Sequence, residues 1–376
     1  MPKFLPLFWI GMMLISSCQK KEQSSNESHS ENIIRYAEGL SIIPHENYTR
    51  VTVSNPWPGA QERQTYIFHK KGVSLADSLK NYSAITVPIQ KMVATSTTHI
   101  PPLEMLEREA SLIGFPNTNY ISSEKTRSRI DRGEVRDVGT NLSLNVEVLI
   151  DMQPDVIMGF GVDGEKKVYE ELRKSGLHII YNGDWTEQHP LGKAEWILLF
   201  GVLFGEEQRA MEWFSKIETA YHEAKQLVAD VDTKPTVMSG SVYQDQWYVP
   251  QGKSWAAQFI QEAGGDYLWK DTDGEGSLAL SFETVLEKAQ HADFWIGPGQ
   301  FYAYDQLLKA NANYTFFKSF QEKKIFTFSH KKGATGGVIY YELAASRPDW
   351  VLKDLIKIMH PERLPEHSLV FFEPLQ

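Results

Sequence analysis

Apolar and polar residues alternate with the period of an α-helix through one long stretch of the chain. Residues 206–232 contain no Gly or Pro, and apolar or small side chains recur there in steps of four and three. This spacing places those side chains on one face of a helix and leaves the charged ones facing water. They are Ala210, Phe214, Ile217, Tyr221, Ala224, Val228 and Val231. At 1.5 Å per residue the helix would be about 40 Å long, more than one domain usually requires.

An ordinary surface helix can carry the same stripe, so the position of this stretch decides its interpretation. Short β-like runs alternate with helical runs on both sides of it, a pattern typical of parallel or mixed sheets covered by helices. The predicted strands are 84–88, 91–96, 155–160, 178–182, 235–243, 293–298 and 324–328. The predicted helices are 101–113, 146–152, 165–175, 191–204, 255–263, 282–290 and 349–359. Residues 35–70 add further β-like sequence before this alternation begins.

One helix–strand unit occurs on each side of the long stretch. Residues 144–159 and 280–297 each contain a helix with Glu in its first turn (Glu147 or Glu283), then Asp, a buried strand and a final Gly. Two lobes built on one plan leave a cleft where their strand ends face each other, and open α/β sheets bind ligands at such ends. We therefore predict an α/β fold of two lobes joined by a single long rigid helix, with a ligand cleft between the lobes.

Composition narrows the range of partners. The length of 376 residues suggests two domains, and the net charge of −10 argues against nucleic acid, which requires a basic face. The chain contains ten Trp, sixteen Tyr and nineteen Phe. Aromatic side chains serve first as core material, but a surplus also suits a cleft for a large ring-bearing ligand.

The single cysteine, Cys18, ends an export-type leader. Lys3 precedes an apolar run, residues 4–15, that is too short to span a bilayer. Ile15-Ser16-Ser17-Cys18 resembles the lipobox of bacterial lipoproteins, whose cysteine is acylated; a plain signal peptide is the alternative. We expect a signal peptide at 1–17, a flexible polar tether at 18–34, and a lipid anchor at Cys18 that holds the protein outside the cytoplasm.

A glycine-rich turn raises the possibility of a nucleotide site. Residues 159–164 read G-x-G-x-x-G after a strand and before a helix, and Asp184 lies twenty residues beyond Gly164. However, this unit does not open its domain, and an exported lipoprotein has little access to NAD. We favour a turn that lines the cleft wall.

Signatures of catalysis are missing from the sequence. It contains no G-x-S-x-G, no H-E-x-x-H and no cysteine suited to nucleophilic attack, and no carboxylate pair is placed for acid–base work. His99 follows a predicted strand end and should face the cleft, as a metal or haem ligand or, as is commoner for histidine, as a hydrogen-bonded polar side chain. Glu147 and Glu283 admit three roles: helix caps, catalytic acids in the cleft, or equivalent docking points for a two-fold partner with basic pockets.

Several segments together resemble the substrate-binding lipoproteins of ABC importers for iron–siderophore complexes, cobalamin and haem. They are Cys18 with its tether, VATSTTH at 93–99, GEVRDVG at 133–139, PDVIMG at 154–159, EQHPLGKAEW at 187–196, the long helix, and RPDWVLKDL with HPE at 347–362. The resemblance covers residues 35–365, and its most specific parts are the closing segment and PLGKAEW. It implies an N-terminal lobe at 35–205, a linking helix at 206–232, a C-terminal lobe at 233–376, modest closure and no catalysis.

The resemblance also implies roles for individual residues. One glutamate per lobe would engage arginines of the two permease subunits, and the matching positions are Glu147 and Glu283. The implied cleft residues are Thr97, Thr98, His99, Tyr120, Thr140, Phe160 and Trp185 in the first lobe, and Tyr243, Trp247, Tyr302, Lys331 and Thr335 in the second. Of these, His99, Lys331 and Thr335 would orient the ligand between aromatic walls.

These observations predict a monomeric, lipid-anchored solute-binding protein that is not an enzyme and has no metal or cofactor of its own. It would deliver a ferric siderophore or related metal chelate to an ABC permease dimer with its ATPase subunits. Cobalamin or haem is the alternative ligand, although the chain lacks the Cys pair of the cobalamin carrier. It also lacks a clear Arg cluster for a strongly anionic siderophore. A secreted hydrolase using cleft carboxylates, or a surface adhesin, would belong to a different class.

Overall fold

The computed structural model describes residue 1 and residues 31–376, apart from 55, 58–59, 61–62 and 162–165. Residues 31–376 form one compact unit. Cys18 and nearly all of the expected signal peptide lie outside the described residues. The expected tether is too long at its end, because Ile33 N donates to Ile42 O (3.0 Å) and Ile34 is buried.

The first strands form a sheet of their own, with the order β1-β2-β3-β4. Its strands are β1 (Leu40–Pro44), β2 (Tyr48–Val53), β3 (Gln64–Lys70) and β4 (Ser83–Val87). β1, β2 and β3 pair antiparallel, and β4 pairs parallel to β3. Val51 and Val53 are both fully buried, as the two-residue period of a strand with one covered face requires. The β-like sequence at 35–70 therefore forms a sheet together with β4, the strand predicted at 84–88.

The first α/β sheet has the order β11-β10-β5-β6-β7, and all its pairs are parallel. Its strands are β5 (Met92–Ala94), β6 (Leu112–Phe115), β7 (Arg136–Asp137), β10 (Val156–Gly159) and β11 (Ile179–Tyr181). Every residue of β5, β10 and β11 is buried, which is the pattern of a parallel sheet covered on both faces. A small hairpin, β8 (Gly139–Thr140) with β9 (Ser143–Leu144), follows β7.

The second α/β sheet has the order β15-β12-β17-β18-β19 and is parallel except for β19, which runs antiparallel to β18. Its strands are β12 (Thr236–Ser239), β15 (Asp266–Tyr267), β17 (Phe294–Ile296), β18 (Ile325–Thr327) and β19 (Glu373–Pro374). A three-stranded sheet beside it contains β13 (Ser241–Tyr243), β14 (Gln246–Pro250) and β16 (Ser277–Leu280). The predicted α/β fold class, with parallel and mixed sheets, is confirmed. We call residues 31–205 the N-terminal lobe and residues 236–376 the C-terminal lobe.

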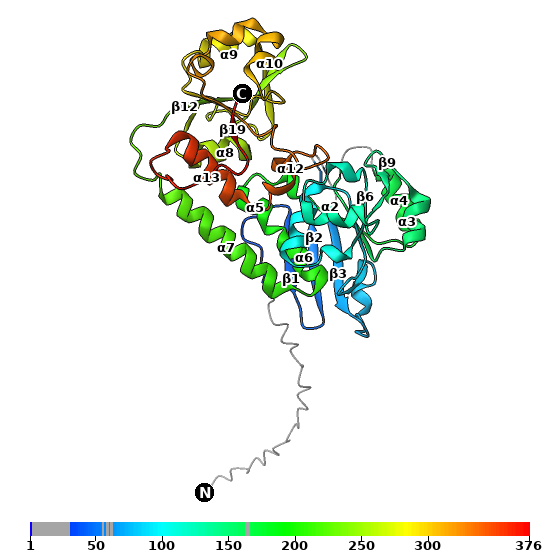
Figure 1. Cartoon of the computed structure of the whole chain (residues 1–376). Helices are drawn as coiled ribbons and strands as arrows, with labels where there is room; N and C mark the ends of the chain where they lie inside the picture. The colour runs from blue at the N-terminus through cyan, green and yellow to red at the C-terminus, as the bar shows by residue number, and fades with distance from the viewer. Residues whose placement is uncertain (2–30, 55, 58–59, 61–62, 162–165) are drawn as a thin grey trace. The chain divides into compact units, whose positions relative to one another are not determined.

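Helices surround these sheets (Figure 1). The α-helices are α1 (Ile100–Met105), α2 (Glu124–Asp131), α3 (Val146–Met152), α4 (Lys166–Lys174), α5 (Pro190–Glu195), α6 (Ile197–Phe204), α7 (Glu207–Gln226), α8 (Trp255–Glu262), α9 (Phe282–Ala289), α10 (Tyr304–Ala310), α11 (Lys318–Gln321), α12 (Ile339–Leu343) and α13 (Pro348–Met359). The 3-10 helices are η1 (Asp77–Leu79), η2 (Thr97–His99), η3 (Glu109–Ser111), η4 (Thr118–Tyr120), η5 (Asp184–Thr186) and η6 (Ala312–Phe316).

The long helix α7 is shorter than predicted. It has 20 residues, about 30 Å, because it ends at Gln226 and turns follow to residue 230. The predicted apolar stripe is confirmed within α7, where Ala210, Phe214, Ile217, Tyr221 and Ala224 are buried. The other two predicted members, Val228 and Val231, lie beyond the end of the helix. α7 packs against α6 of the N-terminal lobe and α13 of the C-terminal lobe (Figure 1).

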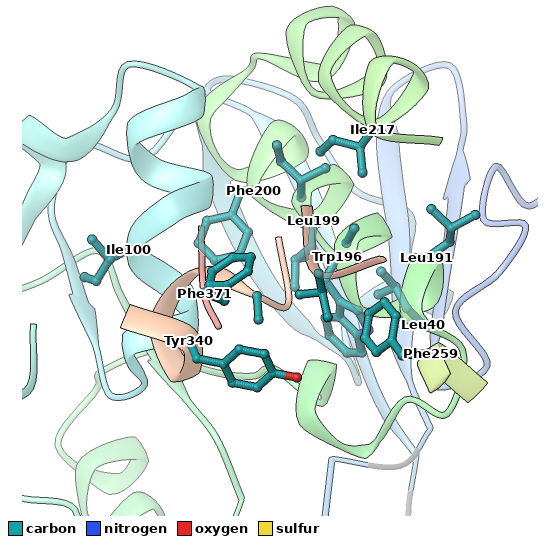
Figure 2. Close-up of a cluster of buried hydrophobic side chains, with 14 of the residues drawn as sticks. Leu40, Ile100, Leu191, Trp196, Leu199, Phe200, Ile217, Phe259, Tyr340 and Phe371 are labelled. Carbon is teal, nitrogen blue, oxygen red and sulfur yellow. The ribbon is translucent and has the colours of Figure 1, made fainter. Parts of the chain in front are cut away.

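One hydrophobic core runs through both lobes. Figure 2 shows part of it around α6, whose residues are all buried, as the apolar run at 191–204 predicted. Leu40 of β1 and Ile100 of α1 belong to the same cluster as Phe259 of α8 and Phe371 near the C-terminus (Figure 2). Fully burying a side chain such as Phe contributes about 1.5–3 kcal/mol. A shared core of this kind opposes a wide hinge motion between the lobes.

The helix predicted at 101–113 is wrong in its second half. α1 ends at Met105, and Glu107 has a φ of 56°, which a continuing helix does not allow. The following residues, 112–115, form strand β6 instead. A Cβ on Gly114 would lie 2.8 Å from the Met152 Cε atom, so this glycine serves the packing of α3 on the sheet and does not end a helix.

The internal repeat is present in the fold. Asn145 caps α3 by accepting from Val148 N (3.1 Å), and Ser281 caps α9 by accepting from Thr284 N (3.1 Å). The aspartates that follow these helices also have equivalent contacts. Asp155 accepts backbone N–H bonds from residues 90 and 91, just before β5, and Asp293 accepts one from residue 236, at the start of β12. Each aspartate therefore ties its own strand to the neighbouring strand of the sheet.

Candidate ligand-binding site

A cavity of about 190 Å³ lies between the two lobes. The N-terminal lobe contributes Thr98, Asp184, Trp185, Pro190 and Lys193. The C-terminal lobe contributes Trp255, Phe259, Tyr340, Tyr341, Ala344 and Ala345. Its walls are therefore mostly aromatic, with one carboxyl group and one amine.

Strand ends of the N-terminal lobe position the polar side of the cavity. Thr98 belongs to η2, which follows β5, and the Ser96 side chain caps this turn. Asp184 and Trp185 belong to η5, which follows β11. Because parallel strands end at one edge of a sheet, these turns meet there, where open α/β sheets bind ligands.

Lys193 of α5 fixes the turn that carries Asp184 and Trp185. Its Nζ atom donates to the main-chain oxygens of both residues, each at 3.1 Å, and lies 5.4 Å from the Trp255 ring centroid. Burial lowers the pKa of Lys193 to about 8. The ammonium group therefore serves first as a bridge between α5 and this turn.

The C-terminal lobe supplies the aromatic wall. Trp255 and Phe259 lie one turn apart on α8, and their rings meet edge to face at 5.8 Å. Tyr340 of α12 stacks on Trp255 at 6.0 Å and is buried, whereas the adjacent Tyr341 is 52% exposed. These four side chains also line a second cavity of about 210 Å³ inside the C-terminal lobe, so the wall separates two adjoining spaces.

Two of the twelve ligand residues predicted from the sequence, Thr98 and Trp185, line the cavity between the lobes. The other ten are not among its lining residues. Four of them are exposed: Tyr120, Thr140, Tyr243 and Thr335. Four are half-buried: Thr97, Phe160, Tyr302 and Lys331. The remaining two, His99 and Trp247, are fully buried.

The prediction that His99 faces the cleft is wrong. The η2 turn directs the ring inward, where it lies 6.1 Å from the Phe200 ring. Burial lowers the pKa of His99 to about 3, so the imidazole is neutral. Among the residues that the structure describes, neither ring nitrogen has a hydrogen-bond partner, so a hydrogen-bonded role is also not observed.

Trp247 and Lys331 have structural contacts in place of the predicted ligand contacts. The Trp247 Nε1 atom donates to Ser239 O (3.1 Å), and the ring packs at 5.2 Å on Trp295 in the core of the C-terminal lobe. The Lys331 Nζ atom donates to the main-chain oxygens of Leu369 (2.6 Å) and Val370. Lys331 therefore holds the C-terminal segment of the chain.

Two glycines of the glycine-rich turn, Gly159 and Gly161, serve packing. A Cβ on Gly159 would lie 2.7 Å from the Tyr169 ring, and one on Gly161 would overlap Trp57. Residues 162–164 lie outside the described residues. Neither Gly159 nor Gly161 lines the cavity between the lobes, whereas Asp184 does, and the contribution of this turn to the cleft wall stays a prediction.

Most lining residues were not predicted because their spacing and residue type are those of ordinary core or surface residues. Trp255 and Phe259 are spaced like any buried pair on a helix, and Lys193 looks like a solvent-facing residue of PLGKAEW. The adjacent aromatics Tyr340 and Tyr341, after the glycine-rich segment 333–337, were the one local signal that could have been followed.

A polar seam joins the lobes beside the cavity. Glu342 of α12 accepts from the backbone N–H groups of Ser122 (2.6 Å) and Ser123 (2.9 Å), which lead into α2. The Thr335 hydroxyl donates to Asn119 O (2.8 Å). Since α12 also carries Tyr340 and Tyr341, the same short helix contacts both the cavity and the seam.

Glu342 should make the stability of this seam depend on pH. Burial raises the pKa of its carboxyl to about 7, Glu104 acts in the same direction, and the bonds from Ser122 and Ser123 oppose both. A pKa above the ordinary 4.5 means that Glu342 stabilises the fold most below pH 4.5 and loses this contribution as the pH rises through about 7. We expect the free energy of unfolding of wild type, relative to Glu342→Gln, to fall by about 2–3 kcal/mol between roughly pH 5 and pH 8.

Urea unfolding of both proteins across this pH range measures that difference. Glu124→Gln, at an exposed position in the first turn of α2, is the matched control and should follow the wild-type profile. A difference between wild type and Glu342→Gln that stays constant or grows with pH would contradict the assignment.

The two repeat-related glutamates lie on the surface. Glu147 and Glu283 are each the second residue of their helix, α3 and α9, and both side chains are exposed. Neither lines the cavity, so they do not act as cleft acids. Among the described residues, no group of three or more His, Cys, Asp or Glu side chains is placed to hold a metal ion. In the same part of the chain, no helix has the length and apolar character needed to cross a membrane.

Comparison with known proteins agrees with this architecture. The family model described as periplasmic binding protein matches residues 92–330. The uncharacterized lipoprotein MJ0878 of Methanocaldococcus jannaschii is 25% identical over 372 residues, which cover 92% of this chain and 86% of the relative.

Solved structures share the fold at lower identity. A periplasmic heme binding protein from Pseudomonas aeruginosa matches with a TM-score of 0.57 and 16% identity, over 77% of this chain and 98% of that one. The triscatecholate siderophore binding protein FeuA from Bacillus subtilis, complexed with ferri-bacillibactin, matches with a TM-score of 0.55 and 16% identity. That match covers 74% of this chain and 95% of that one. At such identities the likeness concerns the fold.

Proposed function

The chain belongs to the periplasmic binding protein family, and from this premise we propose that it captures an organic metal chelate outside the cytoplasm and delivers it to an ABC importer. A member of this family is a solute-binding protein and not an enzyme, so the hydrolase alternative is set aside. The proposed ligand is a complex of the iron–siderophore type, held in the cavity between the lobes.

The aromatic lining of that cavity carries the proposal. Trp185 comes from one lobe and Trp255, Phe259, Tyr340 and Tyr341 come from the other, so a ligand between them would contact both. Apolar area removed from water contributes about 25 cal/mol per Å², which favours a ligand with a broad organic body. Two proteins that share this fold, one binding heme and one a ferric siderophore, agree with this ligand class.

Delivery would use the exposed pair Glu147 and Glu283. They occupy equivalent positions in the internal repeat and carry their charge on the surface, one on each lobe. A permease dimer presents two equivalent faces, and basic pockets on them would attract one glutamate each. The partner is therefore an ABC permease dimer with its ATPase subunits.

Anchoring would occur through Cys18, which lies outside the described residues. The leader sequence before it and the description of the archaeal relative as a lipoprotein support this part of the proposal. The acylated protein would act as a monomer, with the folded unit from residue 31 onward held near the membrane.

Titration of the purified protein with ligands tests the proposal. Trp185 and Trp255 line the cavity, so intrinsic fluorescence should be quenched when the cavity fills. We expect saturable, stoichiometric quenching by at least one member of a panel of ferric hydroxamates and ferric catecholates, with haemin and cyanocobalamin as the alternative ligands. If only haemin or cyanocobalamin gives saturable quenching, the ligand is haem or cobalamin and not a ferric siderophore. No saturation by any member would reject the chelate-binding function.

A further inference from the structure

We propose that a polar cavity of the N-terminal lobe is a binding site for a phosphate-class oxyanion, held by Arg63 and Arg173. This polar cavity has a volume of about 370 Å³. Its lining comes from residues 63–66, 81–83 and 177–179, together with Arg173. It therefore lies between the starts of β3 and β4 and the segment that leads from α4 into β11. It shares no lining residue with the cavity between the lobes.

Strand β11 separates the polar cavity from the cavity between the lobes. Ile179, the first residue of this strand, lines the polar cavity, and so does His178 just before it. Asp184, in the turn that follows the strand, lines the cavity between the lobes. Ligands of open α/β sheets bind at the carboxyl ends of the strands, whereas the polar cavity lies at the amino end of β11. The polar cavity is therefore a separate site and not an extension of the cleft.

The polar cavity carries positive charge in a chain whose net charge is −10. Arg63 and Arg173 line it, and none of its described lining residues is Asp or Glu. Among the arginines that the structure describes, only Arg50, Arg63 and Arg173 form no ion pair with another described residue. Two of these three arginines therefore meet at one cavity, where an anionic ligand would supply the counter-charge.

Both guanidinium groups are available to a ligand. Arg63 is exposed, so a ligand can reach it from solvent. Arg173 is half-buried near the end of α4, and its guanidinium carbon lies 5.2 Å from the Tyr181 ring centroid. This cation–π contact holds the Arg173 side chain in place, and no hydrogen bond joins that side chain to another described residue. The planar fork of an arginine presents parallel N–H donors that match the oxygens of a phosphate group.

Neutral polar groups complete the lining. Asn81 and Ser83 are exposed residues at the start of β4, and each offers hydrogen-bond donors. Burial lowers the pKa of His178, and the charge of Asp155 opposes this effect only in part, so the imidazole adds a hydrogen-bonding group without a charge. Donors spread around a cavity favour an anion with several oxygens, such as phosphate, over a halide ion.

Calorimetric titration of the purified protein with inorganic phosphate, glycerol 1-phosphate and dihexanoyl phosphatidylglycerol tests the site. Dihexanoyl phosphatidylcholine is the control without net charge. We expect wild type to bind at least one of the three anions saturably and not to bind phosphatidylcholine. Arg63→Gln and Arg173→Gln should each weaken that binding by about tenfold, because each removes charge-assisted hydrogen bonds. Arg50→Gln removes an exposed arginine of β2 that does not line the polar cavity, and it should keep the wild-type affinity.

Three results would overturn the site: no saturable binding of any of the three anions to wild type, equal affinities of wild type and Arg63→Gln, or an equal loss in Arg50→Gln. Arg63 is exposed, so its substitution tests the proposal even if Arg173→Gln, which loses the contact with Tyr181, fails to fold. Tighter binding of inorganic phosphate or glycerol 1-phosphate would support the site and identify its ligand as a free phosphate compound. Tighter binding of phosphatidylglycerol would support the site and identify its ligand as a lipid headgroup.

Discussion

Substituting both Glu147 and Glu283 with alanine is expected to abolish uptake of the ligand into cells and to leave the affinity of the purified protein for the ligand unchanged. Both side chains are exposed and neither lines the cavity, so their loss removes no ligand contact. Charge pairs at protein interfaces couple by about 1.5–7 kcal/mol, so losing two of them should weaken docking by at least about a hundredfold. Each single substitution should have an intermediate effect.

Uptake of labelled ligand and calorimetry of the purified variants measure the two halves of this prediction. Glu171→Ala and Glu287→Ala remove exposed glutamates from α4 and α9 away from the first helical turns, and they serve as matched controls that should transport normally. A double variant that transports at the control rate contradicts the docking role. A double variant that loses affinity for the ligand would show that Glu147 and Glu283 contribute to ligand binding.

Replacing Asp354 with alanine is expected to lower the free energy of unfolding by about 3–5 kcal/mol. This carboxylate of α13 is fully buried and accepts from the backbone N–H groups of Val370 (3.0 Å), Phe371 (2.7 Å) and Phe372 (3.1 Å). It also pairs with the His367 Nε2 atom at 2.7 Å. Alanine would leave these donors buried without their acceptor.

The damage should extend to the aromatic wall of the cavity. Phe371 and Phe372 pack against Tyr340, with ring centroids 5.6 and 5.7 Å away, so a released C-terminal segment loosens a lining residue. Urea unfolding measures the loss of stability. Asp305→Ala removes an exposed i,i+4 pair on α10 and should change stability by no more than about 0.5 kcal/mol. A loss below about 1 kcal/mol for Asp354→Ala would contradict this assignment.

Local patterns predicted much of the fold because one or two forces decide each element. The spacing of apolar residues alone predicted the buried face of α7, and an uninterrupted apolar run predicted the burial of α6. The helix starts at 146 and 282 were also predicted, and Asn145 and Ser281 fix them because capping is a short-range hydrogen bond. The failure at 101–113 came from tertiary structure: the segment 112–115 joins a sheet whose partner strands lie elsewhere in the chain.

The site was less predictable because some of its residues are buried although their residue types usually face water. A lysine usually faces water, yet Lys193 is 8% exposed and bonded to a turn that the sequence does not place next to it. His99 looked like a cleft residue because it follows a strand, but the η2 turn rotates it into the core. Thr98 and Trp185 line the cavity because they lie in η2 and η5, the turns that follow β5 and β11 at one edge of the sheet.

Calorimetric titration of Trp255→Ala, beside Trp213→Ala, tests most directly whether the ligand lodges in this cavity. Trp255 lines the cavity, whereas Trp213 is a half-buried residue of α7 that does not. With any chelate that saturates wild type, we expect at least about a tenfold loss of affinity for Trp255→Ala, from lost ring area, and none for Trp213→Ala. Equal affinities in the two variants would contradict binding between the lobes, because the ligand would then lie elsewhere.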